Sequence, residues 1–384
     1  MARGDEGVQQ AMWKLPLMLA SGFDAVASVG GVLHTGIRTA TALCTGASGQ
    51  GGLFPFGAPD SGHPDRDTGP ARPVSFLEAH PEGLAPITVA YERHGTGKPV
   101  VLLHGIGQDR HAWDQVIPML TARREVIALD LPGFGQSPNL PADVPHDLPA
   151  MVAALGAAFT ALGLRRPHVV GHSLGGLIAL RLAQAGLARS VTALAPAGFW
   201  SEFERRYAFT VLITARHLAR LPDVVVQRIA GTPVGRAALT GILYGRADCC
   251  PPDTLLTCLR ALRQSTAFQS TLRAGRARDL FIGTISGMPV TIAWGTCDRL
   301  LPGRQAERAT AMIPEARLVQ LSGCGHVPMT DAPGQVARLI LHTTASRHVS
   351  NRICGRSAGS EQADGRSSTW LRKGAIPAPN STRA

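Results

Sequence analysis

The sequence lacks any long uninterrupted apolar run. No stretch of about 18 consecutive apolar residues occurs in the 384 residues, so no transmembrane helix is predicted. The seven cysteines are scattered, odd in number and without C-x-x-C spacing. This pattern argues against a disulfide framework or a zinc site and favours a reducing compartment. We therefore expect a cytoplasmic protein with no bound metal.

The sequence also lacks the signature of a nucleic-acid-binding protein, despite a net charge of +11. Residues 199–287 hold 12 arginines against 6 acidic residues, and residues 346–384 hold 7 basic residues against 2 acidic ones. These two segments account for the whole excess, and no aromatic interleaving accompanies it. We interpret the basic residues as a solvated face and expect no nucleic-acid partner.

The first 75 residues carry little periodicity. Lys14 precedes a short apolar run, as in a secretory signal, but Asp24 soon follows it. Residues 57–73 are rich in Gly, Pro and Asp, which is typical of a linker. We interpret residues 1–75 as a variable extension with a linker. A helix between residues 20 and 42 that touches a membrane is the alternative.

Strand-like and helix-like patterns alternate from about residue 86. Such alternation predicts an α/β fold with a doubly wound parallel sheet, which we place at residues 76–345. The expected strands are Ile87–Glu92, Val100–Leu103, Glu125–Leu129, Val169–Gly171, Val191–Ala195, Pro289–Trp294 and Ala316–Leu321. Helices are expected at Leu148–Leu162 and Pro333–Leu341.

The alternation stops at Phe199. Residues 199–287 contain only helix-like pieces, at Glu202–Leu221, Asp223–Ile229, Asp253–Arg263 and Ala267–Arg278. We interpret this segment as a helical cap above the carboxyl edge of the sheet. Residues 346–384 are rich in Ser, Gly and Arg and poor in apolar residues, so we expect a disordered basic tail.

A short apolar strand leads directly into Gly171-His172-Ser173-Leu174-Gly175-Gly176, and a helical pattern follows it. Gly-x-Ser-x-Gly between a strand and a helix is the setting of a nucleophile elbow. A serine on such a sharp turn has a strained backbone, and glycine neighbours leave room for the chain to close around it. The turn would expose the Ser173 hydroxyl and point the Leu174 N–H at a developing oxyanion.

A serine hydroxyl needs a base to take its proton, and that base needs an acid to orient it. Asp298 and His326 each follow an expected strand, so both would lie at the same sheet edge as Ser173. Glu202 is the alternative acid. Asp298 could instead cap a helix, and His326 could be a structural loop histidine. His172 adjoins Ser173 in sequence, so its side chain should diverge from the hydroxyl.

The second oxyanion donor is expected in the loop after Val100–Leu103, where the Ile106 N–H would join that of Leu174. His104 precedes this loop and would brace it by hydrogen bonding while bordering the substrate pocket. Phe199 and Trp200, at the start of the cap, are the other side chains expected in that pocket.

From about residue 86 to 343 the chain resembles the α/β-hydrolase superfamily. The motifs that carry the resemblance are His104-Gly105-Ile106-Gly107, Asp130-Leu131-Pro132-Gly133-Phe134-Gly135-Gln136-Ser137, Gly171–Gly176, Gly295–Pro302 and Gly325-His326. The resemblance implies an eight-stranded, mostly parallel sheet with a helical cap after the sixth strand. It also implies Ser173 as nucleophile, His326 as base and Asp298 as acid, with no cofactor.

The motifs also disfavour some of the reactions that the superfamily catalyses. Epoxide hydrolases and haloalkane dehalogenases that resemble this chain carry aspartate where Ser173 stands, which disfavours their reactions here. We therefore expect a serine hydrolase that cleaves a carboxylic ester or related acyl bond of a small molecule. A cofactorless C–C hydrolase of meta-cleavage products is the alternative. A second alternative is a non-catalytic binding protein with this fold. Thioesterases and perhydrolases also remain as alternative enzyme classes.

Overall fold

The computed structural model describes residues 74–246, 250–277 and 279–346. Almost all of the expected N-terminal extension and of the expected basic tail lies outside these residues. In the part that is described, no helix is both long enough and apolar enough to cross a bilayer.

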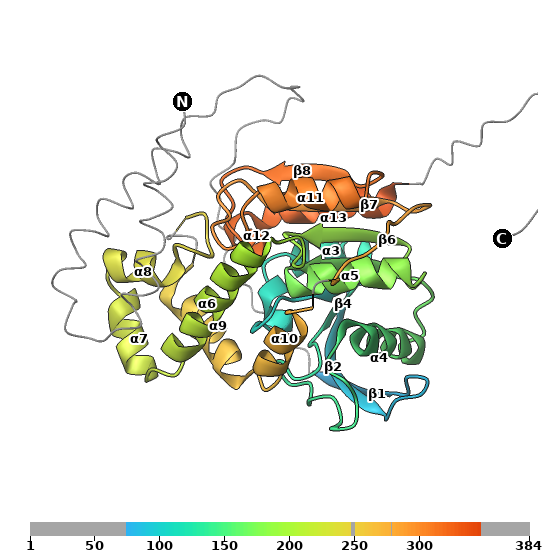
Figure 1. Ribbon diagram of the computed structural model, residues 1–384, viewed down its shortest axis with the longest axis horizontal. Helices are drawn as coiled ribbons and strands as arrows, with labels where there is room; N and C mark the ends of the chain where they lie inside the picture. Colours follow the sequence, from blue (N-terminus) through green and yellow to red (C-terminus); the bar gives the residue numbers. More distant parts are fainter. Residues whose placement is uncertain (1–73, 247–249, 278, 347–384) are drawn as a thin grey trace, which may run out of the picture. The chain divides into compact units, whose positions relative to one another are not determined.

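The core of the protein is an eight-stranded sheet with the strand order β1-β2-β4-β3-β5-β6-β7-β8 (Figure 1). The strands are β1 Ser75–Ala79, β2 Ile87–His94, β3 Lys98–Leu103, β4 Arg124–Leu129, β5 His168–His172, β6 Ser190–Leu194, β7 Val290–Gly295 and β8 Arg317–Leu321. The pairs β1–β2 and β2–β4 are antiparallel, and all the others are parallel. The predicted mostly parallel α/β sheet is therefore confirmed.

Strand β1 was missed in the sequence. Its five residues are mostly exposed, and it lies at the edge of the sheet with Ala79 opposite Ile87. An edge strand buries too little side-chain surface to impose a clear apolar pattern, so the first strand we expected was β2.

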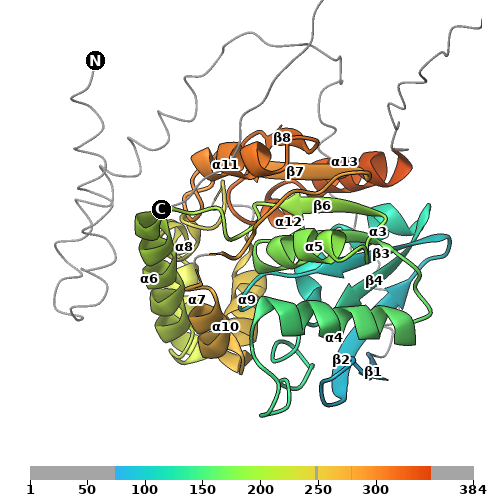
Figure 2. The ribbon, with the colours of Figure 1, turned by 45° about the vertical axis from the view of Figure 1, so that its right-hand side comes forward.

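Helices cover both faces of the sheet, as the continuous apolar strands require. In β3, Val101 and Leu103 point into the core layer under α4 Leu148–Ala161, α5 Leu174–Gln184 and α11 Arg304–Met312. Val100 and Leu102 point into the opposite layer, under α3 Ile117–Thr121 and α13 Pro333–Ala345. Figure 2 shows α4 and α5 side by side on their face. A short 3-10 helix, η2 Arg110–Trp113, and a four-residue helix, α12 Pro328–Asp331, complete the core.

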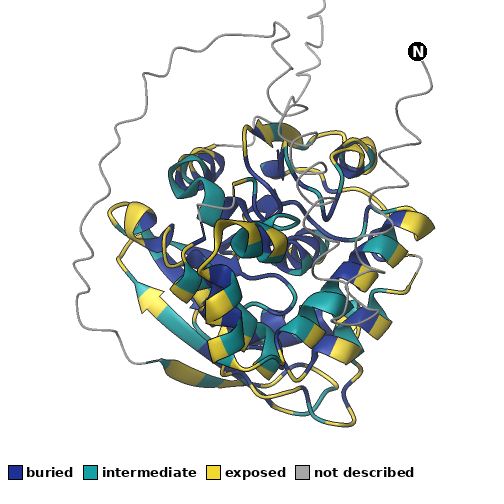
Figure 3. Ribbon diagram, turned by 90° about the vertical axis from the view of Figure 1, so that its left-hand side faces the viewer, coloured by how far each residue is buried: buried dark blue, intermediate teal, exposed yellow. Residues whose placement is uncertain are grey.

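The described part of the segment between β6 and β7 holds five helices: α6 Glu202–Leu218, α7 Asp223–Ala230, α8 Pro233–Thr240, α9 Pro252–Gln264 and α10 Phe268–Ala274. Four of them match expected helical pieces, and α8 was missed. Thr232 caps α8 and Pro233 opens it, a start signal hidden by the neighbouring glycines. We call the segment 199–287 the cap segment. Buried and exposed positions alternate within the turns of its helices (Figure 3), the pattern of helices packed on one side.

Candidate active site

Ser173 stands on a strained turn between β5 and α5. Its backbone has φ 52° and ψ −112°, a left-handed conformation that is rare for a residue with a side chain. A Cβ at Gly171 would lie 2.0 Å from the Gly175 carbonyl oxygen, and one at Gly175 would lie 2.4 Å from that of Leu103. Both glycines are therefore required by the close approach of backbone around Ser173.

Backbone hydrogen bonds hold the strained turn in place. The Ser173 N–H donates to the Leu194 carbonyl over 2.9 Å, and the Ser173 carbonyl accepts from Leu177 and Ala197 over 3.1 and 3.0 Å. Ser173 is buried, with 7% of its surface exposed. The sheet and α5 thus set the position of this side chain before any substrate arrives.

Asp298 and His326 come together at the carboxyl ends of β7 and β8. His326 Nδ1 lies 2.9 Å from Asp298 Oδ2, and both side chains are buried. The other oxygen, Oδ1, accepts the N–H groups of Leu300 and Leu301 over 3.0 and 2.8 Å. A carboxylate held in this way keeps the histidine proton on Nδ1, which leaves Nε2 able to accept a proton.

His172 connects this pair to the serine turn. Its Nε2 donates to the His326 carbonyl oxygen over 2.7 Å, and the two rings lie 4.9 Å apart. Burial, followed by the electrostatic influence of the neighbouring His326, holds the pKa of His172 well below its usual range. Because His172 directly precedes Ser173, this bond places the His326 loop beside the serine turn.

Asp331 is a residue of this region that sequence reasoning missed. Its Oδ2 accepts the N–H of Gly325 over 2.7 Å and that of Gly245 over 2.9 Å. The Val327 N–H also donates to the Leu243 carbonyl over 3.1 Å. The loop that carries His326 is thereby tied to the cap segment. No local signal marks Asp331, because its partners lie up to 86 residues away.

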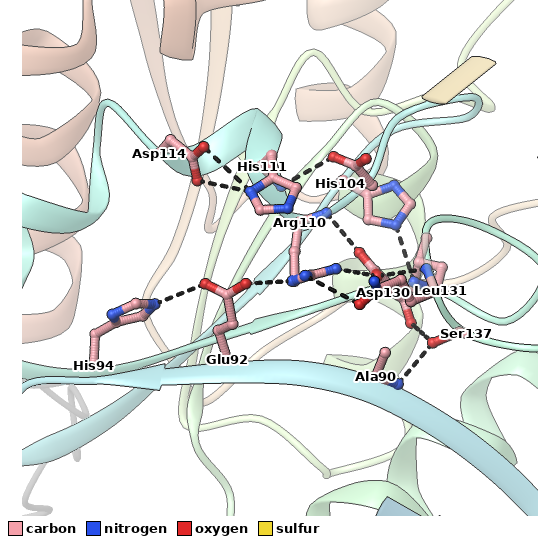
Figure 4. A network of polar contacts seen from close by, with 12 residues as sticks. Ala90, Glu92, His94, His104, Arg110, His111, Asp114, Asp130, Leu131 and Ser137 are labelled. Atoms are coloured by element: carbon pink, nitrogen blue, oxygen red, sulfur yellow. Dashed lines mark hydrogen bonds and ion pairs between the residues drawn. The ribbon is translucent and has the colours of Figure 1, made fainter. Parts of the chain in front are cut away.

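The loop Gly105–Asp109, where the second oxyanion donor is expected, follows β3 and is held at its first end by His104 (Figure 4). We call it the oxyanion loop after that expectation. His104 Nε2 accepts the Leu131 N–H over 2.9 Å, and Nδ1 lies 2.8 Å from the Gly105 carbonyl oxygen. An amide can only donate, so Nε2 carries no proton and Nδ1 donates. Burial lowers the pKa of His104, in agreement with a neutral ring.

The other end of the oxyanion loop is held by Arg110, which is also buried (Figure 4). Its N–H and Nη1 donate to the two carboxylate oxygens of Asp130, each over 2.7 Å, and its Nε donates to Glu92 over 2.6 Å. Asp130 Oδ2 also accepts the Gln136 N–H over 2.8 Å. The sequence motif pointed to the Asp130 loop, but the roles of Arg110 and Glu92 went unrecognised.

A cavity of about 810 Å³, measured with its open mouth, adjoins Ser173. Ile106, Leu174 and Trp200 line it together with Ser173. Its remaining lining residues are His146, Asp147, Leu148, Met151, Leu177, Ile178, Ala197, Ala208, Phe209, Leu212, Thr271, Leu272, Ala274, Gly275, Leu280, Leu300 and Leu301.

Two side chains expected in the pocket do not line this cavity. His104 is buried under the oxyanion loop, where both ring nitrogens are engaged. Phe199 packs against Phe281, with ring centroids 5.4 Å apart, and is 3% exposed. Trp200, the next residue, lines the cavity because neighbouring side chains leave the backbone in different directions.

Glu202, the alternative acid, lies on the first turn of α6. Its carboxylate is exposed and pairs with Arg205 and Arg206 over 2.6 and 2.9 Å. Two residues on, Glu204 is buried and contacts Arg304 and Arg308 of α11. Glu204 therefore anchors α6 to the core, whereas Glu202 faces solvent.

A mostly parallel sheet with a strained serine turn and an Asp–His pair at its carboxyl edge is typical of a hydrolase. The alpha/beta hydrolase family model matches residues 100–339, and the chain belongs to this family.

Relatives of the chain include proteins named as hydrolases of different kinds. It is 33% identical over 187 residues to the epoxide hydrolase EphH of Mycobacterium tuberculosis, covering 47% of this chain and 86% of that one. It is 26% identical to a pimeloyl-[acyl-carrier protein] methyl ester esterase of Aeromonas hydrophila, covering 67% and 99%. A thermophilic esterase from Thermogutta terrifontis shares the fold, with a TM-score of 0.53, 22% identity and coverage of 70% and 97%.

Proposed function

We propose that the protein is a serine hydrolase that cleaves a carboxylic ester or a related acyl bond of a small molecule. Ser173 acts as the nucleophile, His326 as the general base and Asp298 as the acid that orients it. The observation that carries the proposal is the buried 2.9 Å contact between His326 Nδ1 and Asp298 Oδ2, next to the strained Ser173 turn.

The proposed reaction has two halves. His326 Nε2 takes the proton from Ser173 Oγ as that oxygen bonds to the ester carbonyl carbon. The negative charge on the former carbonyl oxygen is stabilised by the N–H groups of Leu174 and Ile106. The carbon–oxygen bond to the alcohol breaks, and His326 gives its proton to the departing oxygen. Water then attacks the acyl-enzyme in the same way and releases the acid.

A serine at the elbow favours acyl transfer over epoxide opening. Opening an epoxide with a serine oxygen would leave an ether on the enzyme, and water does not readily cleave an ether. An acyl group on serine is an ester, which water can cleave with the same base and oxyanion donors. The methyl ester esterase among the relatives supports this choice.

Labelling with a fluorophosphonate probe tests the proposal directly, because the probe bonds covalently to an activated serine. We expect labelling of the wild-type protein and none of Ser173→Ala, with turnover of p-nitrophenyl esters reduced about 10⁴-fold or more. Labelling that persists in Ser173→Ala would refute the role of Ser173. Faster turnover of a meta-cleavage dienone than of any ester would instead support C–C hydrolysis.

A further inference from the structure

We infer that the cavity beside Ser173 binds the acyl chain of the substrate, and that this chain is apolar and uncharged throughout. The inference rests on the proposed function and adds two points to it: which half of the ester enters the cavity, and which acids are excluded.

The chemistry of the lining supports an apolar chain. Most of the side chains are aliphatic or aromatic, and they come from both the core and the cap segment. Leu212 and Phe209 face the cavity from α6, and Leu272 faces it from α10. Each methylene buried there contributes about 0.8 kcal/mol, which corresponds to about a fourfold gain in kcat/KM.

The position of His326 decides which half of the ester enters. The departing alcohol oxygen receives its proton from His326 and so must lie beside that ring. Ile106 and Leu174, whose N–H groups are the proposed oxyanion donors, line the cavity, and His326 does not border it. The acyl chain, which stays bonded to Ser173 when the alcohol leaves, is therefore the half that extends into the cavity.

The charges of the lining exclude acids with a second carboxylate. None of the residues that border the cavity is a lysine or arginine, and the only carboxylate is that of Asp147. The one histidine of the lining, His146, already has its Nδ1 3.3 Å from Ser270 Oγ. A carboxylate at the far end of an acyl chain would lose water there without gaining a cationic partner. Esters of neutral fatty or arylaliphatic acids thus fit the cavity, and monoesters of dicarboxylic acids do not.

The first test measures kcat/KM for p-nitrophenyl esters from acetate to dodecanoate. We expect it to rise severalfold with each early methylene. Ala274→Leu fills part of the cavity and should lower kcat/KM for the longer esters about tenfold or more relative to that for acetate. Gln269→Leu, on the exposed side of the same helix, is the matched control and should behave as wild type.

A second series keeps the acyl group constant and lengthens the alcohol. We expect kcat/KM to change little along this series and Ala274→Leu to have no length-dependent effect on it. If Ala274→Leu instead penalises long alcohols, the cavity holds the alcohol and the inference is wrong. This outcome would leave the proposed function intact, because Ser173→Ala would still abolish every reaction.

Asp147→Asn tests the exclusion of charged acyl chains. The Asp147 carboxylate accepts the Ala150 N–H over 2.9 Å as the cap of α4, and asparagine caps helices equally well. Asp147→Asn should therefore fold normally, and its effect is read as the ratio of kcat/KM for adipate monoesters to that for hexanoate esters. Adipate monoesters should be at least tenfold poorer than hexanoate esters in wild type and should improve severalfold in Asp147→Asn. Equal rates for adipate and hexanoate in wild type would overturn the exclusion of charged chains.

Discussion

Leu131 donates its backbone N–H to His104 Nε2 over 2.9 Å, which fixes the imidazole as a neutral ring with its proton on Nδ1. That proton faces the Gly105 carbonyl at the start of the oxyanion loop. At the far end of the loop, Arg110 binds Asp130, the residue before Leu131. One short segment thus fixes both ends of the loop that carries Ile106.

Replacing His104 should therefore impair turnover more than substrate binding. In His104→Leu the Leu131 N–H stays buried without an acceptor, at a cost of about 1–3 kcal/mol in unfolding free energy. We expect kcat to fall about tenfold to a hundredfold with KM nearly unchanged, since a displaced oxyanion donor weakens mainly the transition state. His104→Gln places an oxygen near Nε2 and should recover part of kcat. An equal loss in both variants would contradict this account.

The choice of acid can be tested with two amide substitutions. Asparagine at position 298 can donate to His326 and so hold the wrong tautomer, which in a comparable triad costs about 10⁴-fold in kcat. We expect a loss of this order in Asp298→Asn, measured by steady-state ester hydrolysis. Glu202→Gln should retain wild-type kcat, because that carboxylate pairs with Arg205 and Arg206 at the surface. The reverse result would identify Glu202 as the acid.

The ion pairs of Glu204 with Arg304 and Arg308 should anchor the cap segment to α11. Burial by itself would raise the pKa of Glu204, but the Ser201 N–H and the guanidinium groups of Arg304 and Arg308 hold it below its usual value. Glutamine can still accept the Ser201 N–H, so Glu204→Gln removes mainly the two ion pairs. We expect a loss of about 1–2 kcal/mol in urea unfolding. Glu202→Gln on the same helix turn is the control and should unfold as wild type does.

His168 should make stability depend on pH. Burial, with the nearby charges of Arg124, Arg189 and Lys98, lowers the pKa of His168 to about 4. Between that value and about 6.5 the unfolded chain binds a proton that the folded protein does not. The contribution of His168 to the free energy of unfolding is therefore fully present above pH 6.5 and is lost as the pH falls towards 4.

We expect His168 to contribute a loss of about 2 kcal/mol in unfolding free energy between pH 7 and pH 5. The comparison is with His168→Asn, whose amide reaches the position of Nδ1 and can keep the 2.7 Å contact with Ser190. We measure the unfolding free energy of both proteins by urea titration. Between pH 7 and pH 5, the decrease in His168→Asn should be smaller than the decrease in wild type by about 2 kcal/mol. Parallel pH dependence in the two proteins would show that His168 titrates normally.

The sequence alone was sufficient for the features that depend on neighbours along the chain. The Gly171–Gly176 turn needs its glycines for contacts within the turn and with β3, and the apolar runs of β3, β4 and β5 need cover on both faces. Such constraints leave a periodic or positional trace in the residues themselves. The sheet apart from β1, four of the five cap-segment helices that the structure describes and the position of Ser173 could therefore be predicted.

Only the tertiary structure decided which distant polar groups meet. Asp331 binds Gly245 across 86 residues, and Arg110 of η2 binds Glu92 of β2. The structure also separated Trp200, which lines the cavity, from Phe199, which packs against Phe281. Contacts of this kind depend on how whole elements pack in space. Their hydrogen bonds are strengthened where the packing excludes water from a few polar atoms, and this leaves no repeating pattern in the chain.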